Sequence, residues 1–307
     1  MVSERTGLTI GVAETIGGRP NMEDAFSACD IGGPNQRATL LCVFDGHGGT
    51  RAVDLLAVRF GKIFDEEYSG TRMSIDRMSD RMSVESTSGV VDVLLSTFKR
   101  AETEVMNKHF SIGGSNICGC LFSLDEEHPT LYCAHLGDTR AVLCRGGLAV
   151  RLTSMSDHKA TDTFEKARIE KSGNSVSNDR VGGMLAISRA FGDAILKDIR
   201  SENEAEKIPC VLKAAVTAIP DITATRVFAS EDAFVIVGCD GLFDVVSDQE
   251  AVNLVSECLA NLVDLWDEKS YGPWNAPVTA QLLARCLVEE ALARGSLDNV
   301  TCAIVFF

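Results

Sequence analysis

Residues 43–49 read VFDGHGG and close an apolar run, TLLCVF, that begins at residue 39. The run 39–44 predicts a buried strand that stops at Asp45-Gly46. Gly48-Gly49 and the residues that follow predict a turn into a helix. The stretch therefore places a carboxylate and the imidazole of His47 at the end of a strand, beside glycines that let a ligand approach the backbone.

The same pattern recurs along the chain. Apolar residues precede an acidic residue at five places that span most of the sequence. A single Asp-Gly is an ordinary turn, but five such places are harder to explain as turns alone. The acidic residues are Glu23 and Asp24, Asp45, Asp138, Asp240 and Asp298.

Carboxylates brought together repel one another, and their pKa values rise unless cations neutralise them. Magnesium and manganese prefer such oxygen ligands, together with carbonyls and waters. A two-metal site turns bound water into hydroxide and stabilises an in-line displacement at phosphorus. Arg19, four residues before Glu23, can bind a phosphate in a bidentate manner. His47, beside Asp45, is placed to donate a proton to the leaving oxygen.

Competing phosphatase chemistries have their own sequence marks. A cysteine phosphatase needs arginine six residues after its cysteine, and none of the 11 cysteines has one. An aspartyl-phosphate enzyme needs D-x-D, which the sequence does not contain. Other two-metal phosphoesterases start from D-x-H, which Asp45-Gly46-His47 matches, but their later motifs are not found.

The composition of the chain limits the classes of partner and the compartments that fit it. The net charge is −15 and the pI is about 4.8, which argues against nucleic acid and anionic membranes as partners. No apolar run is long enough for a membrane helix, and the start of the chain lacks a signal-peptide pattern. Cysteines in apolar runs, such as Cys42 and Cys239, fit buried thiols in a reducing compartment. We therefore expect a cytoplasmic or nuclear protein, and a monomer, since coiled-coil heptads are not seen.

Short strands in runs, with paired helices rather than strict alternation, predict an α+β fold in one domain over residues 1–307. Helices are expected at 90–107, 164–171, 247–263 and 278–293. Two polar stretches are interpreted as inserted loops. One is 65–89, in which Arg-Met-Ser begins at 72, 77 and 81, and the other is 198–209.

Several longer strings, in order, resemble the metal-dependent type 2C serine/threonine protein phosphatases. They cover nearly the whole chain and are specific as a set. The strings are RPNMED (19–24), VFDGHGG (43–49), LGDTRAVL (136–143), DHK (157–159), GGMLAISRAFGD (182–193), IPDI (219–222), CDGLFDV (239–245), QEAV (249–252) and GSLDNVT (295–301).

The resemblance implies a four-layer α-β-β-α sandwich of two antiparallel sheets flanked by helices. It implies hydrolysis of phosphoserine and phosphothreonine in proteins by a metal-bridging water, without a phosphoenzyme. It also implies two magnesium or manganese ions and a weaker third. Asp45 would bridge two metals, Glu23 and the Gly46 carbonyl would bind one, and Asp240 and Asp298 the other.

The same resemblance assigns the remaining residues of the site. Asp138, with Asp240, would bind the third metal, and Asp24 would support the ligands. Arg19 would hold the phosphate and His47 would act as general acid. Residues 158–181 would form a flap beside the cleft. The family often has proline after DHK, so Ala160 is expected to loosen the entry to that flap.

Other polar residues have two interpretations each. For most of them we favour a structural role over a functional one. These residues are His158, Arg189 in an internal ion pair, Asn299 at its turn, Asp193 at a turn rather than behind the metal ligands, and the packing or surface histidines His109, His128 and His135. Asp244 is left open between structure and orienting a ligand. The functional alternative to an enzyme is a pseudophosphatase that binds partners, whose mark would be lost acidic ligands. The sequence keeps them all.

Overall fold

The computed structural model describes residues 1–32, 38–76, 87–108, 113–123, 129–197, 215–265 and 276–307. Some of the expectations above lie outside these residues. They are the loop 198–209, the Arg-Met-Ser repeats that begin at 77 and 81, His109 and His128. Within the described chain, no helix is both long and apolar enough to cross a membrane.

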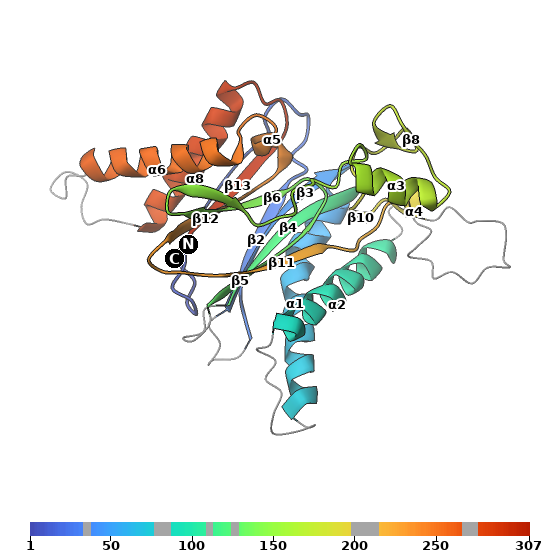
Figure 1. The fold of residues 1–307 in the computed structure, drawn as a ribbon, viewed down its shortest axis with the longest axis horizontal. Helices are drawn as coiled ribbons and strands as arrows, with labels where there is room; N and C mark the ends of the chain where they lie inside the picture. The colour runs from blue at the N-terminus through green and yellow to red at the C-terminus, as the bar shows by residue number, and fades with distance from the viewer. Residues whose placement is uncertain (33–37, 77–86, 109–112, 124–128, 198–214, 266–275) are drawn as a thin grey trace.

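Two antiparallel sheets form the centre of the molecule (Figure 1). The first runs in the order β1 (Thr9–Thr15), β13 (Val300–Phe306), β12 (Asp232–Gly238), β6 (Arg140–Arg145) and β7 (Leu148–Arg151). The second runs β11 (Asp221–Arg226), β5 (Thr130–Leu136), β4 (Gly114–Ser123), β3 (Ala38–His47) and β2 (Ala25–Ile31), with β10 (Phe191–Gly192) also paired to β4.

Helices cover the outer face of each sheet (Figure 1). The helices α1 (Arg51–Asp76) and α2 (Thr87–Met106) pack on the second sheet. The helices α6 (Asp248–Leu265) and α8 (Ala276–Ala293) pack on the first. The expected four-layer α-β-β-α sandwich is therefore confirmed.

The central strand β3 shows why its sequence is continuously apolar. Leu41 and Val43 point into the layer between the sheets, whereas Cys42 and Phe44 point toward α1 and α2. Because both faces are covered, alternation with polar residues would place them in a core. Burying each such large side chain contributes about 1.5–3 kcal/mol.

Two boundaries differ from the prediction. Strand β3 continues through His47, because Asp45 and His47 still pair with β4. The loop predicted to start at residue 65 is wrong over residues 65–76, which extend α1. That part of the helix has partners: the Asp65 carboxylate accepts the Gly32 N–H at 2.7 Å, and the Tyr68 ring stacks on Phe64 at 5.8 Å.

The edge strand β11, like the two-residue strands, was not predicted. Strand β11 contributes the sequence DITATR to the edge of the second sheet, where β5 is its one partner among the strands that the structure describes. Its residues are half-buried or exposed. The low apolar content of an edge strand explains why apolar runs did not reveal it.

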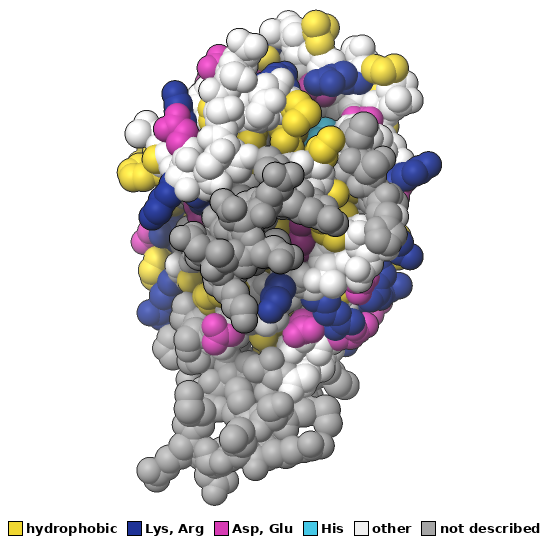
Figure 2. All heavy atoms as spheres, turned by 90° about the vertical axis from the view of Figure 1, so that its right-hand side faces the viewer, with side chains coloured by type: hydrophobic (Ala, Val, Ile, Leu, Met, Phe, Trp, Pro, Cys, Tyr) yellow, Lys and Arg dark blue, Asp and Glu magenta, His cyan; other side chains and the backbone are white. Residues whose placement is uncertain are grey.

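The segment expected as a flap packs into a small core that it shares with Ile187, Ala190, Leu196, Ala215 and Val216. It contains α3 (Thr163–Lys171), which confirms the predicted helix, and the hairpin β8 (Val176–Ser177) and β9 (Arg180–Val181). Its apolar side chains include Ala160, Ile169 and Val181. The face that carries α3, α4 (Ala194–Lys197) and β8 presents separate hydrophobic patches among charged side chains (Figure 2).

Candidate metal centre

The structure brings the scattered acidic segments together at one end of the sandwich. They line a cleft of about 460 Å³ that opens beside the flap. The sequence-predicted residues in its lining are Arg19, Glu23, Asp45, Gly46, His47, Asp138, Asp240 and Asp298. From the flap side, Arg180 and residues 185–187 also line it, so the cleft wall extends beyond the expected flap boundary at 181.

Three carboxylates form the centre of this cleft. Oxygens of Asp45, Asp138 and Asp240 lie within 4.8 Å of one another. Burial, and then the charge of Asp240, raises the pKa of Asp45 well above its usual range. Burial raises the pKa of Asp138 to about 8, and burial with nearby Asp244 raises that of Asp240 to about 6. The site therefore holds more negative charge than its own cations neutralise.

The end of β3 at Gly46 packs closely against the segment that contains Glu23. A Cβ at Gly46 would lie 2.2 Å from the carbonyl oxygen of Glu23, so only glycine fits there. The Glu23 carboxylate accepts the Gly49 N–H at 2.9 Å. The turn after β3 is thereby fixed against the segment that enters β2.

Asp298 and Arg19 contact each other across the cleft mouth. Arg19 Nη2 donates to Asp298 Oδ2 at 2.5 Å, and this hydrogen bond raises the pKa of Arg19. The Arg19 side chain is 55% exposed, so it is free to turn. As predicted, Asn299 supports the turn at Asp298, because its N–H donates to Asp298 Oδ1 at 2.8 Å. Its side-chain Oδ1 also accepts the Glu23 N–H at 2.7 Å and so ties this turn to the segment before β2.

Asp24 lies behind the cleft and is not part of its lining. It is 8% exposed, and its Oδ2 has no hydrogen-bond partner in the described residues. Burial raises its pKa to about 7. Asp24 is expected among the metal-site residues as a supporting carboxylate, and this position favours that role.

Two contributors to the site were missed by sequence reasoning. Asn116, which pairs with Asp45 across β3 and β4, donates from Nδ2 to Asp138 Oδ1 at 2.6 Å. Lys159 Nζ lies 3.1 Å from Asp244 Oδ1 and 3.9 Å from Asp138 Oδ2. The DHK string was the available signal for Lys159, whereas Asn116 needed the strand register.

His47 faces a carboxylate of its own. Its Nε2 lies 2.8 Å from Asp193 Oδ2, a residue expected at a turn or behind the metal ligands. The His47 side chain is 26% exposed and that of Asp193 is 8% exposed. The imidazole thus borders the cleft while one of its nitrogens is bound from behind.

Comparison with known proteins decides the family. The protein phosphatase 2C family model matches residues 9–300. Protein phosphatase 2C homolog 1 of Schizosaccharomyces pombe is 34% identical over 294 residues, which cover 94% of this chain and 69% of that protein. The chain belongs to the protein phosphatase 2C family.

Other relatives agree in sequence and in fold. The integrin-linked kinase-associated serine/threonine phosphatase 2C of Bos taurus is 33% identical over 313 residues, covering 96% of this chain and 75% of the relative. A crystal structure of serine-threonine phosphatase 2C from Toxoplasma gondii superposes with a TM-score of 0.72 and 22% identity, covering 98% and 95% of the two chains. A Caenorhabditis elegans sex determining protein gives a TM-score of 0.71 at 23% identity, and 97% of this chain spans 64% of that one.

Membership makes the protein a metal-dependent serine/threonine protein phosphatase that acts on phosphoproteins. The cleft fits that requirement, because its donors are carboxylate, carbonyl and amide oxygens, the ligands of hard divalent cations. A second group of metal-type side chains, Cys118, Cys120 and Cys133, lies in the dry core between the sheets, where thiols act as small apolar groups.

The flap of this phosphatase is tied to the cleft through His158. Its Nδ1 accepts the Gly137 N–H at 3.1 Å, next to Asp138, and its Nε2 lies 3.0 Å from Asp221 Oδ2. Both nitrogens therefore have partners within the protein. The ring stacks on His135 at 4.4 Å, and burial lowers the pKa of His135 to about 3. The structural interpretations of both histidines are confirmed.

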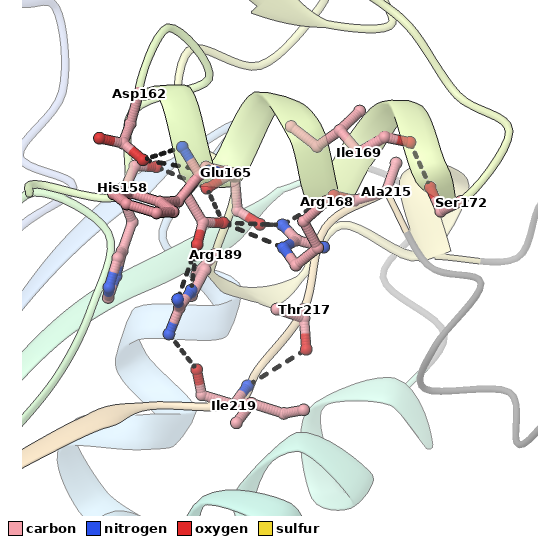
Figure 3. Close-up of polar contacts among 12 residues, drawn as sticks. His158, Asp162, Glu165, Arg168, Ile169, Ser172, Arg189, Ala215, Thr217 and Ile219 are labelled. Carbon is pink, nitrogen blue, oxygen red and sulfur yellow. Dashed lines mark hydrogen bonds and ion pairs between the residues drawn. The ribbon is translucent and has the colours of Figure 1, made fainter.

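An ion-pair network continues from there into α3 (Figure 3). Arg189 donates to Asp221 Oδ1 at 2.7 Å and to Glu165 Oε1 at 2.6 Å, which confirms the predicted internal pair. Burial acts to raise the pKa of Glu165, but hydrogen bonds from Arg189 and Ser188 lower it to about 2. The hydrogen bond with His158 lowers the pKa of Asp221.

The expected effect of Ala160 is not what the structure shows. The Ala160 N–H donates to the Ala186 carbonyl at 2.6 Å, a hydrogen bond that proline could not make. Ala160 is also fully buried. Alanine therefore adds a tie between the entry of the flap and the cleft wall, where a looser entry was expected.

Proposed function

We propose that the cleft hydrolyses phosphoserine and phosphothreonine esters with two magnesium or manganese ions and a weaker third. One ion would be held by Glu23 and the Gly46 carbonyl and another by Asp240 and Asp298, with Asp45 shared. Asp138 with Asp240 would hold the third. The observation that supports this is the group of three carboxylates within 4.8 Å, whose pKa values are raised by burial and by the charge of neighbouring carboxylates.

Divalent cations bound there would activate water and offset the charge of the phosphate. Arg19 contributes the binding of the phosphate group. Its exposed guanidinium can exchange Asp298 for phosphate oxygens, since both are bidentate anionic partners. The exchange would also free Asp298 for its cation.

His47 contributes the proton. In a single in-line displacement the P–O bond to the leaving group breaks, and its electron pair stays on the serine or threonine oxygen. An alkoxide is a poor leaving group, so a proton from His47 lowers the barrier. A phosphoenzyme is not needed, because water attacks directly.

The test is metal-dependent dephosphorylation of a phosphothreonine peptide. Activity should disappear in excess EDTA and return with millimolar magnesium or manganese. Asp240→Asn should lower the rate by more than the roughly 10–100-fold that a partner of a metal ligand typically costs. Asp264→Asn, an exposed site on α6, removes the same charge and should leave the rate unchanged.

Two results would contradict the proposal. One is activity that persists in EDTA. The other is near-normal activity of Asp240→Asn at subsaturating metal. A folded protein that binds metal by calorimetry but has no activity with either ion would instead favour the pseudophosphatase.

A further inference from the structure

We propose that Asp193 is a positioning residue that fixes the tautomer and the orientation of His47, so that Nδ1 is the nitrogen that delivers the proton. The contact that carries this is the 2.8 Å distance between Asp193 Oδ2 and His47 Nε2. An ionised carboxylate only accepts hydrogen bonds, so the proton on the neutral ring must sit on Nε2. The inference rests on the general-acid role proposed above for His47.

Asp193 is held in a backbone conformation that few residues adopt. Its φ is 51°, in the left-handed region, where a non-glycine residue is uncommon. Its N–H donates to the Gly113 carbonyl at 3.1 Å, and its own carbonyl accepts the Leu196 N–H at 2.9 Å. Such strain persists where the surroundings determine the conformation, and it gathers at functional sites.

The neighbouring strand leaves room for the carboxylate. A Cβ on Gly114 would lie 2.4 Å from Asp193 Oδ2 and 2.3 Å from the Phe191 carbonyl oxygen. Gly114 is also the residue that pairs with His47 in the sheet. The glycine thus lets the carboxylate pass over β4 and reach the imidazole.

The segment around Asp193 is anchored to the helical layer as well. Glu102 of α2 accepts the Gly192 N–H at 3.0 Å and the ammonium of Lys197 at 2.6 Å. The Phe191 ring stacks on Phe98 at 5.4 Å. These anchors hold the residues on both sides of Asp193 against the helical layer.

The proton balance follows from this arrangement. Before the reaction, a doubly protonated His47 would donate Nε2–H to Asp193 and keep Nδ1–H for the leaving oxygen. Transfer of the Nδ1 proton gives the alcohol and a neutral ring, which still carries Nε2–H. Asp193 therefore has the same hydrogen bond before and after the transfer, and solvent returns the proton to Nδ1. The carboxylate does not itself become protonated.

The first measurement is made on the unaltered protein. Nitrogen NMR of the imidazole in the magnesium-loaded enzyme reads the tautomer directly, with His47→Gln used to assign the signal. Whenever the ring carries a single proton, that proton is expected on Nε2, which faces Asp193. A single proton found on Nδ1 would overturn the proposal, whether or not any variant folds.

The second measurement compares leaving groups. Asp193→Asn should lower kcat on a phosphothreonine peptide by at least about 10-fold, and no more than His47→Ala does, because it acts through His47. Its kcat on p-nitrophenyl phosphate should change far less, since that leaving group needs little protonation. The double variant should lose little beyond His47→Ala alone, because the two residues act as a unit.

The matched control is Asp232→Asn, which removes another buried carboxylate with a basic partner, Arg145, at a site remote from the cleft. It should keep both activities. Equal losses of Asp193→Asn on the two substrates, or losses that multiply with those of His47→Ala, would overturn the proposal. If His47→Ala itself shows no dependence on the leaving group, the general-acid role fails, whereas the tautomer still tests the Asp193 contact separately.

Discussion

The cleft and the flap network, which consists of Glu165, Arg168, Arg189 and Asp221, both contain clustered carboxylates, yet the charges of these carboxylates are balanced in opposite ways. In the cleft, burial and mutual repulsion raise the pKa values of Asp138 and Asp240 to about 8 and 6. In the flap network, hydrogen bonds from Arg189 and Ser188 outweigh burial and lower the pKa of Glu165 to about 2. The flap network contains the guanidinium groups that pair with its carboxylates, whereas the cleft contains too few cationic side chains to pair with its own.

This difference separates structural carboxylates from those that await a ligand. The Glu165 carboxylate is paired with both Arg168 and Arg189, and these ion pairs hold α3 in place. Around Asp138 the nearby cation is Lys159, at 3.9 Å and 38% exposed, which cannot balance three carboxylates. A divalent cation supplies the charge that the fold itself omits.

The sharpest way to break the comparison is to remove the flap carboxylate. Glu165→Gln leaves the guanidinium groups of Arg168 and Arg189 beside a neutral side chain in a buried place. Breaking such a pair typically costs about 3–5 kcal/mol. We expect the lower part of that range, because Asp221 still binds Arg189, and urea unfolding at pH 7.5 measures it.

The matched control lies on the same helix. Glu170→Gln, an exposed position of α3, should change the free energy of unfolding by less than about 0.5 kcal/mol. Hydrolysis of p-nitrophenyl phosphate by folded Glu165→Gln should remain within a few-fold of the parent, since Glu165 is not part of the cleft lining. A stability loss below about 1 kcal/mol would show that the network is not structural.

The cleft carboxylates should make the stability of the protein depend on pH and on metal. A rise in pH should lower the stability of the metal-free protein, and magnesium should raise it. The pKa values of Asp24 and Asp138 are raised in the folded metal-free protein, to about 7 and 8, so the folded state binds more protons than the unfolded state. Stability must then fall as pH rises, by about 1–2 kcal/mol between pH 6.5 and 7.5. Magnesium at 100 times its dissociation constant should restore about 2.7 kcal/mol.

Thermal or urea unfolding in EDTA and in magnesium measures both effects. His135 opposes this fall in stability only weakly, because its folded pKa is about 3 and the tail of its unfolded titration near pH 6.5 adds about 0.4 kcal/mol of stability across the window. Asp138→Asn should flatten the pH dependence of the metal-free protein. Stability that rises with pH across this window in EDTA would mean that the cleft carboxylates are already neutralised within the protein.

Most of the fold was accessible from the sequence because buried strands and amphipathic helices carry strong patterns. The exceptions have physical causes. Strand β11 is an edge strand with few apolar residues, so its pairing with β5 gave no periodic signal. Residues 65–76 are polar, but they extend α1 through contacts such as that of Asp65 with Gly32, which only the folded chain provides.

Site residues could be predicted where a polar residue directly follows an apolar strand in the sequence. They could not be predicted where their place depends on a contact between two separate segments. The carboxylates and His47 were found in this way, and all but Asp24 line the cleft. Asn116 and the Asp193 contact were missed, because they depend on the register of β3 with β4 and on the pairing of β10 with β4. The Ala160 hydrogen bond was missed for the same reason, since its acceptor lies 26 residues further along the chain.

The smallest expected effect tests whether α3 depends on its cap or on its ion pairs. The Asp162 carboxylate accepts the N–H groups of Phe164 and Glu165 at 2.9 and 3.0 Å, which satisfies two free donors at the helix start. Asp162→Ala should therefore cost about 1 kcal/mol, less than Glu165→Gln, and Asp162→Asn should restore most of it. Urea unfolding of the three variants side by side gives the ranking. The opposite ranking, in which Asp162→Ala lowers the free energy of unfolding more than Glu165→Gln does, would mean that the cap at its own first turn stabilises α3. Arg168 and Arg189 would then contribute little to keeping α3 in place.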